Sequence, residues 1–262
     1  MVTDLFEKGW AKLPFDAKVK AWAEHAWEAG QQSMHAPEHD PWWDCEGTWF
    51  IGVDALNNDA AGKLPGGPDL PAGPKRAIEA LFGALPDLHP AQMSVVFPGY
   101  PKARRGENEA GLRYRRNRDA AHLDGLLRGE DGGRRVEEPH AWILGMPLTT
   151  NAFSESPLVI WEGSHEILRK ALGEAFAPHL PETWHEIDVR AVYQETRKTI
   201  FETCNRVPVC AQPGEAIVMH RLTLHGVAPW IGGDVESPCR AVAYFRPILA
   251  GGVPSWIAQD GG

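Results

Sequence analysis

Residues 207–247 read VPVCAQPGEAIVMHRLTLHGVAPWIGGDVESPCRAVAYFRP, and this stretch decides the fold. It contains three short apolar runs, Val207–Gln212, Glu215–Arg221 and Arg240–Pro247, separated by turn residues such as Pro213-Gly214. Runs of this length, bounded by Pro and Gly, are typical of strands in a β-sandwich or barrel rather than of helices.

The same pattern extends back to Gln92. Three more short apolar or alternating runs precede the quoted stretch, at Met93–Phe97, His140–Leu148 and Pro157–Trp161. Two helical patterns interrupt the strands, one after Ser164 and one after Asp188. Residues 92–247 are therefore predicted to form an all-β core with added helices.

The first 91 residues have a different character. Residues 16–32 predict a helix with Asp16 as its N-cap, and a second helix is expected at Pro74–Leu85, after the Pro/Gly-rich loop 62–74. This segment has too little regular pattern to build a core of its own. The sequence thus predicts a single domain, 1–262, in which 1–91 is helical and loop decoration and 92–247 is the catalytic core.

Composition narrows the class of protein. The 262 residues include 26 basic and 35 acidic side chains, a net charge of −9, which argues against a nucleic-acid partner. No apolar stretch approaches the roughly 18 residues that a membrane span needs, and no signal peptide is visible. The four cysteines fit neither a zinc knuckle nor a disulfide framework. We therefore expect a cytoplasmic protein without a membrane partner.

The sequence His122-Leu123-Asp124 is the sharpest chemical feature. On a strand, residues i and i+2 point to one face, so this imidazole and carboxylate can converge on one ion. His225 is the best third ligand, because Gly226 beside it permits close backbone approach. His220 is the alternative, and its odd spacing from His225 means that only one of them can face the metal on a regular strand. Two histidines and one carboxylate are the ligand set of non-haem Fe(II) oxygenases.

The order of motifs along the chain resembles one family. From residue 92 to 247 the motifs are His122-Leu123-Asp124, Gly163-Ser164-His165, Pro213-Gly214-Glu215, His225-Gly226 and Arg240. In this order they resemble the phytanoyl-CoA dioxygenase-like family of Fe(II)/2-oxoglutarate-dependent oxygenases. The resemblance implies a cupin-like double-stranded β-helix, or jelly roll, which agrees with the strand pattern.

The resemblance also implies roles for individual residues. His122, Asp124 and His225 would bind iron, and Trp142 would line the cosubstrate pocket. Arg240 would hold the distal carboxylate of 2-oxoglutarate, since a planar guanidinium can bind a carboxylate through two hydrogen bonds. The cofactors would be Fe(II), 2-oxoglutarate and O2. The expected reaction is hydroxylation of a small organic substrate with release of succinate and CO2, because Asp124 occupies the position that is a small residue in related halogenating enzymes.

Two alternatives stay open at this point. One is a cupin-like metal-dependent isomerase or hydrolase that does not use 2-oxoglutarate and needs no buried arginine. The other is a catalytically silent jelly-roll binding protein. If Arg240 does not bind the cosubstrate, Arg246 is the next candidate, because an even spacing puts it on the same strand face.

Two surface features also remain open. The arginine run from Arg104 to Arg118 is either a solvated segment, which we favour, or a site for an anionic substrate. The aromatic residues Trp42, Trp43, Trp49 and Phe50 either belong to the core or line a substrate pocket. Neither the substrate nor the oligomeric state follows from the sequence.

Overall fold

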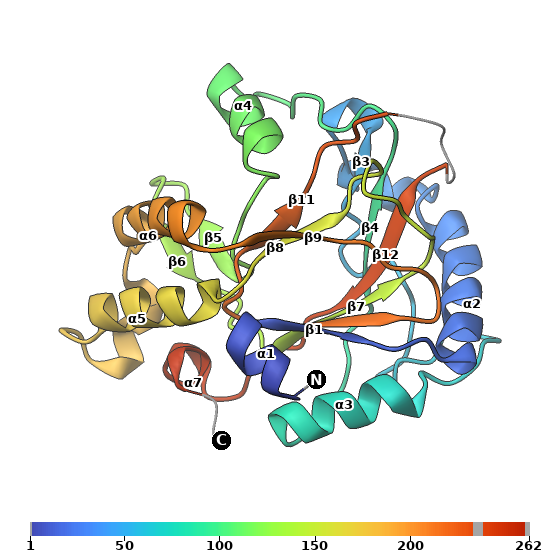
Figure 1. Ribbon diagram of the computed structural model, residues 1–262, viewed down its shortest axis with the longest axis horizontal. Helices are drawn as coiled ribbons and strands as arrows, with labels where there is room; N and C mark the ends of the chain where they lie inside the picture. Colours follow the sequence, from blue (N-terminus) through green and yellow to red (C-terminus); the bar gives the residue numbers. More distant parts are fainter. Residues whose placement is uncertain (1, 233–237, 260–262) are drawn as a thin grey trace.

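The computed structural model describes residues 2–232 and 238–259, and its centre is the predicted double-stranded β-helix (Figure 1). Within these residues, neighbouring strands of both main sheets pair antiparallel. The seven-stranded sheet has the order β1 (Trp10–Leu13), β10 (Ala216–His220), β7 (Trp142–Pro147), β12 (Arg240–Phe245), β4 (Gln92–Val96), β3 (Trp49–Phe50) and β2 (Trp43–Asp44). The three-stranded sheet has the order β11 (His225–Val227), β8 (Leu158–Trp161) and β9 (Arg206–Val209). A separate hairpin consists of β5 (Leu126–Arg128) and β6 (Arg134–Val136).

Helices surround this roll. They are α1 (Val2–Lys8), α2 (Ala17–Ser33), α3 (Ala72–Phe82), α4 (Glu109–Asn117), α5 (Ser164–Phe176), α6 (Arg190–Thr203) and α7 (Gly252–Ile257), with 3-10 turns η1 (Pro37–Trp42), η2 (Cys45–Gly47) and η3 (Pro181–Glu186). Helices α2 and α3 lie along the large sheet, whereas α5 and α6 lie beyond the small one (Figure 1). Among the helices of the described residues, none has the length and apolar character needed to span a bilayer.

Successive side chains of β12 point to opposite faces of the large sheet. Ala241, Ala243 and Phe245 join the core that packs against α2 and α3. Arg240 and Tyr244 therefore point to the opposite face, toward the small sheet, because successive strand residues alternate. On that inner side, residues of β7 and β10 pack directly against residues of β8 and β9. The polar residues of β12 thus face the inside of the roll.

The predicted helices and strands are largely present. Helix α2 begins after Asp16, whose Oδ1 accepts a hydrogen bond from the N–H of Lys18 at 2.8 Å. Helix α3 ends at Gly83, which adopts φ 82°, a left-handed conformation that favours glycine. All six strands expected between residues 92 and 247 are found, each within a few residues of its predicted bounds.

The structure contains elements beyond the expectation, among them strands β5, β6 and β11, which lie outside the six predicted runs. The segment 1–91 is not only helix and loop, because β1, β2 and β3 extend the large sheet at both ends. Strands β2 and β3 have two residues each, which is too short for any periodic signal. In the arginine run, residues Glu109–Asn117 form helix α4, where Asn108 caps the N-terminus by accepting a hydrogen bond from the N–H of Gly111.

Candidate metal centre

A backbone bridge brings the two distant halves of the site together. The N–H of His122 donates to the carbonyl of His225 at 2.8 Å, and the N–H of His225 donates back to His122 at 3.1 Å. The bridge requires Gly226, since a Cβ atom at that position would lie 2.1 Å from the carbonyl oxygen of Asp119. The close approach expected from Gly226 is therefore present. His122 itself lies in this isolated bridge and not on a regular strand.

The three predicted ligands converge. Oδ1 of Asp124 lies 3.3 Å from Nε2 of His122 and 3.8 Å from Nε2 of His225, and all three ligand atoms lie within 4.8 Å of one another. Two ligands at right angles, each about 2.1 Å from a six-coordinate ion, would lie about 3.0 Å apart. The shortest observed spacing, 3.3 Å, is near this value and the next, 3.8 Å, is longer, so the three side chains would draw together slightly to hold one divalent ion on a common face.

Hydrogen bonds orient both imidazoles. Nδ1 of His122 lies 3.0 Å from the carbonyl of Ala120, and Nδ1 of His225 lies 2.9 Å from the carbonyl of Thr223. A carbonyl can only accept, so each Nδ1 carries the proton and each Nε2 is left with its lone pair. This is the usual support for histidines that bind a metal.

The charges of the site also suit a cation. Burial, and then the neighbouring His122, lower the pKa of His225 to about 4, so this imidazole is neutral at pH 7. Burial would raise the pKa of Asp124, but the charge of Arg246 and the contact with His122 outweigh it and hold this pKa well below its usual range. The site thus offers the neutral imidazole of His225 and the carboxylate of Asp124, beside a His122 side chain that is 45% exposed.

Arg240, on the large sheet, and His225, on the small sheet, both point into the interior of the roll. His225 and Val227 share one face of β11, and Val227 packs with Val96, the register partner of Arg240. Arg240 is 2% exposed, and its Nη2 donates to the hydroxyl of Tyr244 at 2.9 Å. Its Nη1 is buried and has no hydrogen-bond partner within the residues that the structure describes.

The structure does not bring Trp142 to this site. Trp142 belongs to the core under α2 and α3, and its ring stacks on Phe82. It therefore occupies the face of the large sheet opposite to Arg240. A bend at Ala141 interrupts the strand alternation, so the neighbouring His140 does not share the orientation of Trp142 and lies instead near Asp124 and Arg246.

His220 is likewise separate from the metal ligands. It ends β10 in the large sheet, whereas His225 begins β11 in the small sheet. The ring of His220 lies 4.9 Å from that of His165, and its Nδ1 accepts the N–H of Leu222. The geometry thus groups His225, and not His220, with His122 and Asp124.

Most of the arginine run has local partners. Arg104 pairs with Asp44, Arg113 with Glu109 and Arg115 with Glu107. Arg118 lies 4.6 Å from the centre of the Phe201 ring. For these four arginines, the contacts agree with the interpretation of the run as a solvated segment.

The N-terminal aromatic residues divide between two environments. Phe50 is fully buried in the core beside Trp43, and Trp42 packs against the same core. Trp49 instead packs at the end of the roll, where its Nε1 donates to the hydroxyl of Ser94 at 3.1 Å. Trp49 is thus the member of this group nearest to Arg240, since both flank Val96 in the sheet.

Two tyrosines that the sequence reasoning missed fix the His122-Leu123-Asp124 segment. The hydroxyl of Tyr114 donates to the carbonyl of Ala121 at 2.8 Å, and the hydroxyl of Tyr193 accepts the N–H of Leu123 at 2.9 Å. Arg197 joins them, because its guanidinium lies over both rings and donates to the Tyr114 hydroxyl. Helices α4 and α6 thereby hold the segment from one side.

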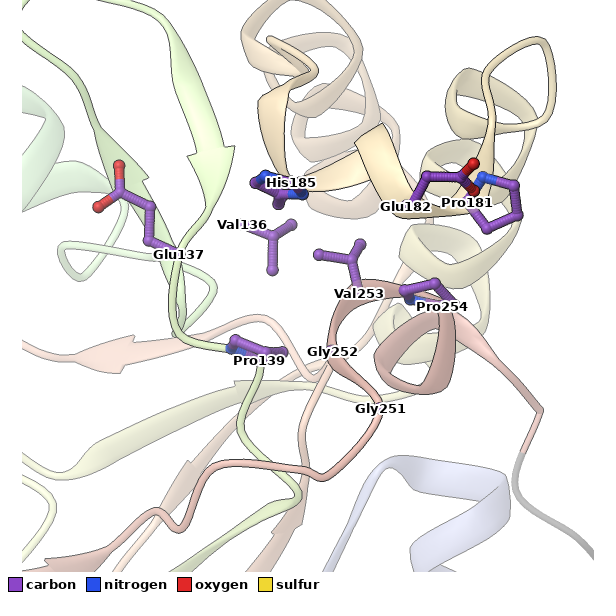
Figure 2. A pocket seen from close by; sticks show the side chains of 10 residues that line it. All are labelled: Val136, Glu137, Pro139, Pro181, Glu182, His185, Gly251, Gly252, Val253 and Pro254. Carbon is purple, nitrogen blue, oxygen red and sulfur yellow. The ribbon is translucent and has the colours of Figure 1, made fainter.

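A surface pocket of about 350 Å³ lies beside the end of the β5–β6 hairpin (Figure 2). It lies between the end of β6, η3 and α7, and its walls include Val136, Pro139 and Val253. The carboxylate of Glu137 points away from the other side chains (Figure 2). None of the three metal-ligand candidates lines this pocket.

Comparisons with known proteins support the architecture. No protein-family model matches the sequence, and no match to a curated protein was found. Among solved structures, the non-heme alpha-ketoglutarate-dependent carbocyclase SnoK from nogalamycin biosynthesis has a TM-score of 0.53 and 16% identity, over 99% of this chain and 90% of that one. EvdMO1 has a TM-score of 0.50 and 14% identity, over 95% of this chain and 49% of that one. At these identities the likeness establishes the fold alone.

Proposed function

We propose that this protein is an Fe(II)- and 2-oxoglutarate-dependent oxygenase that hydroxylates a small organic substrate. The single observation that carries the proposal is the combination of His122, Asp124 and His225 with Arg240 inside one jelly roll. The ligand set is that of non-haem Fe(II) oxygenases, whose three remaining coordination positions stay open for reactants. The likeness of the fold to SnoK, whose name describes alpha-ketoglutarate dependence, supports the same class.

Arg240 distinguishes this proposal from the other metal-dependent functions of the fold. A buried guanidinium with an unpartnered Nη1 is costly unless an anion completes it. The distal carboxylate of 2-oxoglutarate fits this requirement, because it can accept from Nη1 and from the hydroxyl of Tyr244. Tyr244 already accepts from Nη2 and keeps its own proton to donate.

When bound, iron and 2-oxoglutarate supply the oxidising chemistry: one oxygen atom of O2 enters succinate, the other enters the substrate hydroxyl, and CO2 is released. The protein's residues hold the reactants. His122, Asp124 and His225 would hold the ion, Arg240 and Tyr244 would hold the cosubstrate, and the apolar side chains of Val96 and Val227 pack in the same interior.

The motifs His122-Leu123-Asp124, His225-Gly226 and Arg240 support membership of the phytanoyl-CoA dioxygenase-like family. We further propose that the protein acts on a small molecule as a single domain, and its four free cysteines favour the cytoplasm.

An anaerobic titration tests the proposal. Fe(II) followed by 2-oxoglutarate should produce a visible metal-to-ligand charge-transfer band, and admission of O2 should convert 2-oxoglutarate to succinate. Asp124→Ala should abolish both signals, whereas the matched variant His220→Gln should retain them. Binding of Fe(II) without the band would favour a metal-dependent isomerase or hydrolase. Failure to bind Fe(II) would favour a catalytically silent binding protein.

A further inference from the structure

The two carboxylate oxygens of Asp124 have different partners. Oδ1 faces Nε2 of both His122 and His225, at 3.3 Å and 3.8 Å. Oδ2 accepts a hydrogen bond from Nη1 of Arg246 at 3.2 Å. From this division we infer that Arg246 is a positioning residue, which restricts Asp124 to a single bond with the metal. The inference rests on the metal site of the proposed function and adds a residue to it.

Arg246 is well placed for this task because its backbone is fixed on both sides. Its N–H donates to Nε2 of His89 at 3.0 Å, and the carbonyl of the following residue, Pro247, accepts the N–H of Ala141 at 2.8 Å. The side chain is 16% exposed, and that of Asp124 is 10% exposed. A charge-assisted hydrogen bond between two largely buried groups in a fixed frame keeps its geometry better than a surface pair does.

His140 is a basic side chain that interacts with both Asp124 and Arg246, and it does not supply Oδ2 with a cation. His140 lies close to this pair, but burial and the charge of Arg246 lower its pKa, so it is neutral at pH 7. Its Nε2 is directed to Glu138, at 3.4 Å. Loss of Arg246 would therefore leave Oδ2 of Asp124 free to turn toward the metal.

Freedom of Oδ2 matters because a carboxylate can bind a metal through one oxygen or through both. With one oxygen, the three side chains use three of six positions, and three remain. The proposed reaction needs all of these, two for the keto acid and one for O2. With both oxygens, Asp124 would take a fourth position and compete directly with 2-oxoglutarate. Arg246 thus protects the cosubstrate position without touching the cosubstrate.

The test uses Co(II) as the metal, because its visible absorption reports coordination number and no turnover is needed. In Arg246→Leu, Co(II) should still bind, its spectrum should change, and the affinity of the Co(II)-loaded protein for 2-oxoglutarate should fall about tenfold or more. Arg246→Lys, which restores a charged donor, should recover a large part of this affinity. If the leucine variant does not fold, Arg246→Gln provides the same comparison with a smaller expected loss.

The control is Arg206→Leu, which removes another arginine–aspartate pair from the same segment. Arg206 binds Asp119, three residues before His122, through two hydrogen bonds of 2.7 Å and 2.8 Å. Its loss should change the affinity for 2-oxoglutarate by less than about threefold. An equal effect of both variants would overturn the inference in favour of general loosening, as would an unchanged Arg246→Leu. If the wild type binds neither Co(II) nor 2-oxoglutarate, it is the proposed function that fails.

Discussion

Replacement of Arg240 by methionine should weaken the binding of 2-oxoglutarate without lowering the stability of the ligand-free protein. Methionine fills a similar volume but removes the charge and the hydrogen bond to Tyr244. The substitution removes the charge-assisted bond from Nη1 and the support of the Tyr244 hydroxyl, together worth about 2–4 kcal/mol, so the affinity for 2-oxoglutarate should fall roughly 30- to 1,000-fold. Binding of Fe(II) or Mn(II) should change little, because Arg240 is not a ligand.

The same substitution should not weaken the ligand-free fold. The wild type buries a guanidinium with one unpartnered nitrogen, and an apolar side chain of similar size in such a place is commonly neutral or stabilising by up to about 3 kcal/mol. In thermal unfolding of the Mn(II)-loaded protein, 2-oxoglutarate at about 100 times its Kd should stabilise the wild type by about 2.7 kcal/mol, or roughly 5–10 °C.

The assay therefore compares two melting curves for each protein, with and without 2-oxoglutarate. The wild type should show the shift, and Arg240→Met should lose it while its own curve without cosubstrate stays level or rises. An equal shift in both proteins would refute the assignment of Arg240. A large loss of stability in the variant without cosubstrate would refute the argument that its guanidinium is incompletely partnered.

Three further outcomes follow from particular contacts. Tyr193→Phe should cost about 1–3 kcal/mol in urea unfolding, because the buried backbone N–H of Leu123 loses its acceptor. The pKa of His225 is about 4 in the folded protein and about 6.5 in the unfolded chain, so the unfolded state binds more protons between these pH values. The free energy of unfolding should therefore fall by up to about 3 kcal/mol as the pH drops from 7 to 4. His225→Gln should reduce this pH dependence when unfolding is measured at several pH values. Gly226→Ala should destabilise the protein by about 3 kcal/mol or more and reduce its affinity for Mn(II), because the new Cβ would lie 2.1 Å from the backbone oxygen of Asp119. Equal unfolding temperatures and equal Mn(II) affinities of the two proteins in calorimetry would show instead that the backbone at Asp119 can shift at little cost.

The strands of the core could be predicted because their burial gives them a recognisable pattern in the sequence. Strands β7, β8 and β10 are buried on both faces, so they appear in the sequence as continuous apolar runs bounded by turns. The two-residue strands β2 and β3 carry no such pattern. Strand β3 forms by pairing with β4, and β2 forms by pairing with β3, which is a tertiary effect that no local window of sequence contains.

The site was predictable to the extent that its residue types are unusual. His122, Asp124 and His225 stand out chemically, and the glycine after His225 indicated the close backbone approach. The role of Trp142 was implied by the family resemblance alone, and in the structure this side chain lies in the core on the face of the large sheet opposite to Arg240. The position of Arg246 required knowledge of where β12 ends relative to Asp124, which only the assembled sheet provides.

The backbone bridge between His122 and His225 determines when, during folding, the metal site can form. The two histidines lie about 100 residues apart in the sequence, and closing so long a loop is entropically costly before the intervening strands have formed. An ion therefore cannot template the roll in the way that zinc organises a small finger domain, because its ligands meet only when the strands are already in place. Metal delivery becomes a late step of biogenesis, and a chain truncated before residue 225 should leave Mn(II) in solution.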